Sequence, residues 1–228
     1  MRVSIFIFLF MGFSTLLHSQ EIVDATVNNI KSVFQTKKRD FSGEKYGGSP
    51  YFNDNFETGT PYIKNEQQPK FPMRFNAYSD EIEMMPSGNE EVYNMIKKGY
   101  IKAEIGGKVY SLHFFLDKNN NEKEGYLIEL SQPGKVQLFF KPIKILTKAK
   151  EPSSSYETYF PPSYVDQSEF YIITDKHPTA KIFNLKKKDI LNLLNDKSTE
   201  IELFVKKNKL NYKNEADVTK TFNYYNSL

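Results

Sequence analysis

Apolar and polar residues alternate with a period of two through the middle of the chain, from about Tyr46 to Leu146. The same alternation recurs at residues 70–77, 81–84, 101–105 and 108–115. In the first of these runs every second position is apolar, at Phe71, Met73, Phe75 and Ala77. Because successive side chains of a strand point to opposite faces of its sheet, this period predicts strands with one buried face.

Two turn sequences connect these predicted strands. Gly106-Gly107 separates the runs 101–105 and 108–115, and paired glycines favour the positive φ angles of a tight hairpin turn. Residues 132–135 join the runs 126–130 and 136–140, with Pro133 fixing φ and Gly134 expected in the left-handed region. Successive hairpins make an antiparallel meander, so we expect a mainly β fold, either a small barrel or a sandwich. One more strand is expected at residues 169–174.

Helical spacing of apolar residues flanks this β region on both sides. At residues 21–38 the apolar positions recur at steps of three and four, which predicts an amphipathic helix followed by a linker. These positions are Val23, Val27, Ile30 and Phe34. After residue 184 three short segments have the same spacing and predict a C-terminal α-helical appendage. Their apolar positions are Ile190, Leu191 and Leu194, then Ile201, Phe204 and Val205, then Val218, Phe222 and Tyr225.

Candidate N-caps support two of the three C-terminal helices. Asp196 or Ser198 precedes the second helix, and Asn214 precedes the third, with Asp217 three residues later in a near-capping-box arrangement. Helices of about three turns are marginal alone, so we expect them to pack on each other or on the sheet.

The first 20 residues have the features of a secretory signal peptide. Arg2 is basic, residues 3–17 are almost entirely apolar, and Ser19 is a small residue near a polar exit. A membrane anchor, the alternative, needs about 20 apolar residues, whereas this run ends at His18. The expected organisation is therefore a signal peptide at 1–20, a helix and linker at 21–45, a β-rich domain at 46–183 and a helical tail at 184–228. No integral membrane span is expected after cleavage.

Composition excludes several classes of protein. The formal net charge is +3, and about +2 without Arg2, which is too small for a nucleic-acid binder that neutralises phosphates. Arg39 and Arg74 are the other two arginines, and lysine lacks the fork that reads guanine or grips phosphate. The chain has no cysteine, hence no disulfide, thiol nucleophile or lipidated cysteine. We expect a protein free in the periplasm, or alternatively outside the cell.

Histidine is too scarce to build a histidine-rich metal site. Beyond the signal peptide only His113, in a predicted strand, and His177, before a proline, are present. Ser111 lies on the same strand face as His113, but no sequence feature orients the ring and no G-x-S-x-G elbow is present. We therefore expect a half-buried strand histidine, no catalytic residues, no metal and no cofactor.

Acidic residues provide two further candidates. Asp117 opens an oxygen-rich segment that resembles the start of a calcium loop, but Glu122 and Ile128 stand where an EF-hand needs glycine and glutamate. A polar hairpin loop is the better interpretation. Asp54 and Asp80 are candidates for a carboxylate pair in glycoside hydrolysis, which needs a partner carboxylate about 5–10 Å away.

Aromatic residues gather in two segments outside the regular alternation. Residues 151–166 are rich in proline and serine, which predicts a loop. Tyrosine and phenylalanine outside a core give large, rigid contact areas suited to recognition. The candidate partner-binding residues are Tyr156, Tyr159, Phe160 and Tyr164 in this loop, with Tyr51 and Phe52 near the start of the β region. The alternative is that these rings cap the ends of the barrel.

Three segments resemble a pattern found in exported proteins of Bacteroidota. Residues 46–56 contain Gly-Ser-Pro-Tyr, residues 72–83 read Met-Arg-Phe-Asn-Ala-Tyr-Ser-Asp-Glu-Ile-Glu after Pro72, and residues 224–226 read Tyr-Tyr-Asn. In that family a "GSPY" entry leads to an "MRYN-Y-DEIE" hairpin and a lysine-rich helical tail. The resemblance covers most of the chain beyond the signal peptide and implies an envelope protein of a Gram-negative cell. It implies no activity and no catalytic residues.

These features together favour a non-enzymatic periplasmic binding or accessory protein, a soluble subunit that docks on an outer-membrane transport or secretion complex. The expected partner is a protein and not a nucleic acid. Two alternatives stay open: a carboxylate-dependent hydrolase of envelope glycans, and a carrier that holds a small ligand in an apolar pocket of the barrel. The carrier needs a barrel interior that Phe75, Phe115 and Phe140 leave unfilled.

Overall fold

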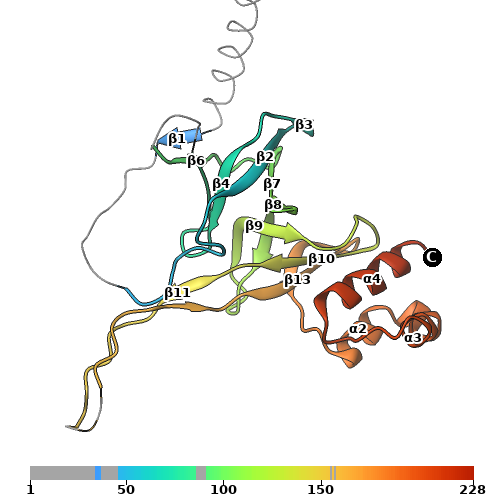
Figure 1. Ribbon diagram of the computed structural model, residues 1–228. Coiled ribbons are helices and arrows are strands. Elements are labelled where there is room, and N and C mark those ends of the chain that lie inside the picture. Colours follow the sequence, from blue (N-terminus) through green and yellow to red (C-terminus); the bar gives the residue numbers. More distant parts are fainter. Residues whose placement is uncertain (1–33, 37–45, 86–90, 155, 157) are drawn as a thin grey trace, which may run out of the picture.

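The computed structural model describes residues 34–36, 46–85, 91–154, 156 and 158–228, and many more of them lie in β-strands than in helices (Figure 1). The strands are β1 (Phe34–Thr36), β2 (Glu57–Ile63), β3 (Glu66–Gln67), β4 (Phe71–Asn76), β5 (Glu81–Met84), β6 (Tyr93–Met95), β7 (Ile101–Ile105), β8 (Lys108–Leu116), β9 (Glu122–Glu129), β10 (Val136–Lys141), β11 (Lys144–Leu146), β12 (Tyr164–Asp166), β13 (Glu169–Thr174) and β14 (His177–Ile182). The expected fold class, mainly β with a C-terminal helical appendage, is confirmed.

Five strands close into a barrel, which decides between the two architectures that the sequence left open. Among the described residues the 12-stranded sheet runs in the order β1-β6-β5-β4-β2-β7-β8-β14-β13-β10-β9, with β3 paired to β2 off this path. An additional pairing joins β9 back to β8. Strands β8, β14, β13, β10 and β9 therefore form a ring. All neighbours in the ring are antiparallel except β14 and β8, which pair in parallel through Ala180 and Phe115. Strands β7, β2, β4, β5, β6 and β1 extend the sheet beyond the barrel.

The hairpin predicted around Gly106-Gly107 is confirmed, with φ angles of 56° and 75° at the two glycines. The second hairpin also forms, but the reason given for Gly134 is wrong, because Gly134 is not among the glycines with positive φ. Glycine is instead needed here because it has no Cβ atom: an added Cβ would lie 2.4 Å from Cγ of Asn226. A close approach, rather than a backbone conformation, selects glycine here.

Three apolar clusters form the interior. The barrel is filled by Phe115, Leu127, Phe139, Tyr171 and Ala180, each at most 5% exposed. A larger cluster lies beside the barrel under the extending strands and contains Met73, Phe75, Ile82, Ile101 and Tyr126. The carrier alternative requires an open barrel, and these described side chains occupy it.

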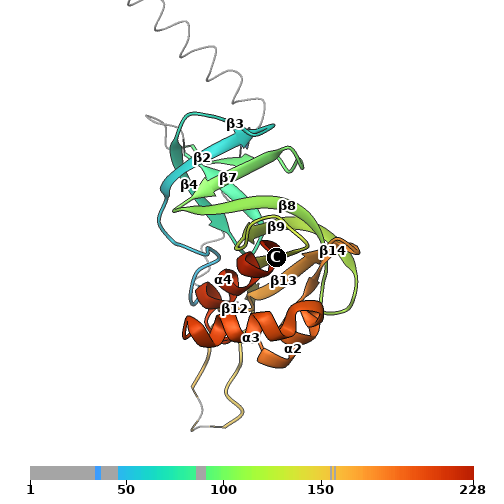
Figure 2. The ribbon, with the colours of Figure 1, turned by 90° about the vertical axis from the view of Figure 1, so that its right-hand side faces the viewer.

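The third cluster joins the C-terminal helices to the sheet (Figure 2). The helices are α2 (Lys187–Leu193), α3 (Ser198–Lys207) and α4 (Glu215–Asn226), with a short 3₁₀ turn, η1 (Asn195–Lys197), between the first two. Ile190, Ile201 and Phe222 are fully buried among them, as their spacing predicts.

The predicted cap of α4 is confirmed, because the Asn214 side chain accepts a hydrogen bond from the backbone N–H of Asp217. The cap proposed for α3 is wrong. Neither Asp196 nor Ser198 caps it; Lys197 stands at the N-cap position without a side-chain bond, because η1 leads directly into the helix.

The helix expected at residues 21–38 is wrong at the three positions that the structure describes. Phe34–Thr36 form β1, which pairs with β6 through Phe34 and Met95. Phe34 is 7% exposed and belongs to the cluster beside the barrel, so burial of this side chain and pairing with β6 outweigh the helical spacing. The signal peptide, the rest of that helix and the linker to residue 45 lie outside the described residues.

Candidate functional site

A two-stranded ribbon, β11 with β12, projects from the end of the barrel as an arm (Figures 1 and 2). Here the arm means residues 144–166. The loop predicted at 151–166 is therefore wrong at Tyr164–Asp166, which forms β12, and an isolated bridge between Lys150 and Phe160 extends the pairing. The ribbon was not predicted from the sequence because each of its strands is only three residues long. The proline and serine residues between the strands predict a loop.

Three of the predicted binding residues lie toward the far end of the arm and expose their rings. Tyr156 is 99% exposed, Tyr159 is 48% exposed and Phe160 is 58% exposed. A ring of this size at a surface leaves a large apolar area in water, unless a partner covers it.

The other three predicted residues come together at the base of the arm, where Tyr51, Phe52 and Tyr164 line one hollow of about 760 Å³. Tyr164 packs edge-on against Tyr46 and Tyr78, with ring centroids 5.8 and 5.2 Å away, and burial raises the pKa of its hydroxyl. The Phe52 ring lies 5.9 Å from that of Phe140. The two segments that the sequence could only name separately therefore share one surface.

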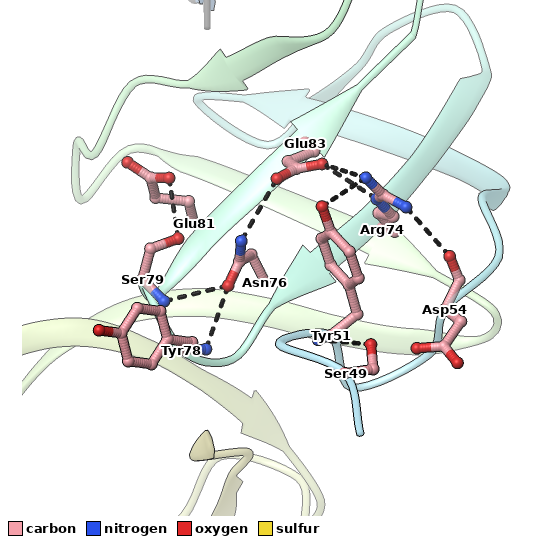
Figure 3. Close-up of polar contacts among 9 residues, drawn as sticks. All are labelled: Ser49, Tyr51, Asp54, Arg74, Asn76, Tyr78, Ser79, Glu81 and Glu83. Carbon is pink, nitrogen blue, oxygen red and sulfur yellow. Dashed lines mark hydrogen bonds and ion pairs between the residues drawn. The ribbon is translucent and has the colours of Figure 1, made fainter. Parts of the chain in front are cut away.

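Arg74 contacts Tyr51 and Asp54, two of the residues that line this hollow (Figure 3). Its Nε and Nη2 donate to Oε2 of Glu83 at 2.9 and 2.8 Å, across the register pair that these residues form between β4 and β5. Nη2 also donates to the Tyr51 hydroxyl at 2.6 Å, and the guanidinium carbon lies 3.5 Å from the centroid of that ring. The Glu83 side chain is 1% exposed, so the charge of Arg74 is neutralised inside the protein.

Arg74 also fixes the turn at residues 53–55. Its Nη1 donates to the backbone carbonyl of Asp54 at 3.1 Å, and the Asp54 carboxylate points away from the guanidinium (Figure 3). Asn76 continues the network, donating to Glu83 at 3.4 Å and accepting from the backbone N–H groups of Tyr78 and Ser79. Most polar side chains of residues 72–83 therefore form hydrogen bonds within this segment.

Backbone contacts hold the rest of the loop that leads into β2. Gly47 donates to the carbonyl of Pro162 and accepts from Tyr164, which ties the loop to the arm. Gly48 has φ of 70°, and an added Cβ atom would lie 2.8 Å from the carbonyl oxygen of Tyr164. The Gly-Gly pair of the sequence motif therefore permits a close approach of the loop to the base of the arm.

Polar side chains complete the hollow: Ser49, Asn53, Asp54, Asn55, Glu57 and Lys144. Asn53 donates to Glu57 at 2.7 Å, and Lys144 pairs with Asp166 at 3.1 Å. Asp54 shares this hollow with Glu57, and Asp80 shares a different hollow with Asp117, Glu124 and Glu169.

Asp80, the other carboxylate, lies at the β4–β5 turn and contacts two lysines. Its oxygens lie 2.8 Å from Nζ of Lys97 and 2.8 Å from Nζ of Lys141. The Lys141 side chain is 6% exposed, and burial lowers the pKa of its ammonium group although the charge of Asp80 acts in the opposite direction. Lys141 also donates to the carbonyl of Tyr126 at 3.1 Å. This cluster connects the extending sheet to the barrel.

The surroundings of Ser111, His113 and Asp117, the other candidates named from the sequence, indicate a structural role for these residues. Ser111 Oγ and His113 Nε2 are 2.9 Å apart, yet Ser111 is 3% exposed and the imidazole packs against Phe139 at 4.7 Å. Burial lowers the pKa of His113. Asp117 accepts from the backbone N–H groups of Asn119 and Asn121 in the β8–β9 turn and pairs with Lys123, and these bonds lower its pKa to about 2. It shapes a hairpin loop, as expected.

The described residues contain neither a metal-binding cluster nor a membrane-spanning helix. No group of three or more histidine, cysteine, aspartate or glutamate side chains in that part of the chain is placed to hold a metal ion. No helix within the same residues has the length and apolar character that crossing a membrane requires.

Comparison of the chain with models of protein families, with curated proteins and with solved structures finds no match.

Proposed function

We propose that this protein is a non-enzymatic accessory protein of the periplasm that docks on a protein partner through its aromatic arm. The observation that carries the proposal is the exposure of three aromatic side chains, Tyr156, Tyr159 and Phe160, on a ribbon that projects from the barrel. The class of partner is an outer-membrane transport or secretion complex. The basic start and apolar run of residues 1–17 support an exported location.

The arm has the physical properties of a recognition element. Aromatic side chains dominate the small set of interface residues that supply most of a binding free energy, and each such residue costs about 2–4 kcal/mol when truncated. The ribbon is anchored at its base by Thr147, whose N–H and hydroxyl both donate to the carbonyl of Ser163. An arm held in this way loses less conformational entropy on binding than a free loop does.

Photo-crosslinking from the arm tests the proposal. A benzophenone side chain placed at position 156 in whole cells is expected to capture one envelope protein, identified by mass spectrometry, in stoichiometric amounts. Adding Tyr159→Ala or Phe160→Ala should weaken that association at least about thirtyfold, the equivalent of 2 kcal/mol, without changing the melting temperature of the isolated protein.

Tyr100 provides the matched control, since it is 51% exposed and lies outside the arm. Tyr100→Ala should leave the captured protein and its amount unchanged. Equal capture from all three variants would contradict the proposal, and so would capture of the partner from position 100 but not from position 156.

A further inference from the structure

The hollow at the base of the arm has a net negative lining. None of the ion pairs between described residues involves Asp54 or Glu57, whereas Lys144 already pairs with Asp166. Arg74 is neutralised by Glu83 behind the wall. A phosphate, sulfate or carboxylate ligand would therefore meet two uncompensated carboxylates, which excludes anionic ligands on electrostatic grounds.

The groups that remain available suit a ligand with many hydroxyl groups. The Asn55 amide can donate and accept hydrogen bonds, and the Asp54 carboxylate can accept from two donors at once. The Asn53 amide donates one N–H to Glu57 and keeps its carbonyl oxygen as an acceptor. The rings of Tyr51, one face of which the Arg74 guanidinium covers, and Tyr164 add apolar surface beside these polar groups. A sugar ring has this combination, since it carries hydroxyl groups around its edge and C–H groups on its faces.

The site is also built to be rigid before a ligand arrives. Arg74 binds the main-chain carbonyl of Asp54 and leaves the carboxylate directed away from it (Figure 3). The N–H of Phe52 donates to Phe75, and the carbonyl of Pro50 accepts from Ala77. A loop fixed by its backbone, with the Asn53 amide already held by Glu57, avoids most of the ordering cost of binding.

We propose that this hollow binds a neutral saccharide, with hydrogen bonds from residues 53–55 and ring contacts from Tyr51 and Tyr164. Its volume of about 760 Å³ lies within the range of small-molecule sites. The site is independent of the protein partner of the arm: it requires the loop at 46–57 and the base of the arm, but not the exposed aromatic residues toward its end.

Saturation-transfer NMR with three named probes tests the proposal: chitotriose, cellotriose and maltotriose. At least one is expected to receive saturation from the protein, and Asp54→Ala/Asn55→Ala should weaken its binding tenfold or more. The matched control, Asp175→Ala/Asn184→Ala, changes one exposed acid and one exposed amide outside the hollow and should leave binding unchanged. Unaltered circular dichroism of both variants shows that the fold is retained.

Three results would overturn the inference. The first is no saturation of any of the three sugars at millimolar concentration, and the second is equal weakening by the two double variants. The third is preferential saturation of a trilysine peptide that disappears at 0.5 M salt, since the hollow would then be an electrostatic site for a basic protein segment. A variant with residues 149–161 replaced by a short Gly-Ser turn separates the two proposals: it should lose the partner of the arm and keep the sugar.

Discussion

Asp80→Asn is expected to lower the free energy of unfolding, because Asp80 in the β4–β5 turn forms ion pairs with Lys97 and Lys141. Asp80 has φ of 57°, a left-handed conformation that asparagine also tolerates, so the substitution leaves the backbone unstrained. The asparagine side chain can still accept from the N–H of Tyr126, which now lies 3.3 Å from the carboxylate oxygens. What disappears is the negative charge between Lys97 and Lys141.

The distances set the size of the effect. At 2.8 Å and an effective dielectric constant of about 20, each ammonium–carboxylate pair has a gross attraction of about 6 kcal/mol. The desolvation of the charges offsets much of this, and removal of one partner from a buried pair costs about 3–5 kcal/mol. Because the Asp80 side chain is 23% exposed, we expect the lower end of this range, about 3 kcal/mol at pH 7.

The loss should shrink as the pH rises. Without Asp80, Lys141 loses the charge that raises its pKa and keeps the burial that lowers it from 10.5. Between the folded pKa and 10.5 the unfolded chain then binds a proton that the folded variant does not, so the stability of the variant relative to the parent increases with pH. Adding Lys141→Met removes the buried ammonium and should restore most of the stability at pH 7.

Urea unfolding followed by circular dichroism at pH 7 and pH 9.5 measures both effects. Glu202→Gln is the control, because Glu202 and Lys187 form a pair that is about half exposed and worth no more than about 1 kcal/mol. The reasoning is refuted if Asp80→Asn costs as little as Glu202→Gln, or if the double variant is no more stable than the single one.

Three further predictions concern other parts of the molecule. The Tyr126 hydroxyl is buried without a hydrogen-bond partner among the described residues, so Tyr126→Phe should leave the free energy of unfolding unchanged or raise it by up to about 1 kcal/mol in a urea titration. Burial lowers the pKa of His113 below 6.5, so the unfolded chain binds a proton first as the pH falls; stability should be complete above about pH 6.5 and decline below it, and His113→Gln should flatten this part of a melting-temperature profile. Asn226 bonds both the N–H and the carbonyl of Val136, at 3.1 and 2.7 Å, so Asn226→Ala should lower the free energy of unfolding by about 1–3 kcal/mol.

Local patterns in the sequence predicted much of the fold. The period of two located β4, β5, β7 and β8, and the helical spacing located α2, α3 and α4, because in each case one face of the element is buried in an apolar cluster. These local patterns could not predict that the sheet closes into a barrel. Closure depends on the parallel contact between Ala180 and Phe115, two residues far apart in the chain whose pairing leaves no local signal.

For the hollow at the base of the arm, the sequence predicted the types of residue involved but not that they lie together. Tyr51 and Tyr164 were named from their aromatic character, yet their meeting in one hollow depends on the bridge between Gly47 and Ser163. Lys141 was missed. In β10 the apolar residues Val136, Leu138 and Phe140 alternate with Gln137, Phe139 and Lys141, so the period of two gives no sign that the Lys141 side chain is buried.

The most conspicuous motif of the sequence therefore has a supporting role. Between Pro72 and Glu83, Arg74 holds the loop above it and Asp80 joins the hairpin to the barrel through Lys141. Groups whose charges are already satisfied by each other have little left to offer a ligand or a substrate. The residues that we propose to meet a ligand or a partner are the polar side chains at 53–55, in the loop that this hairpin holds, and the exposed rings of the arm. In this chain the prominent motif belongs to the scaffold, and the binding surfaces that we propose lie in the less regular segments next to it.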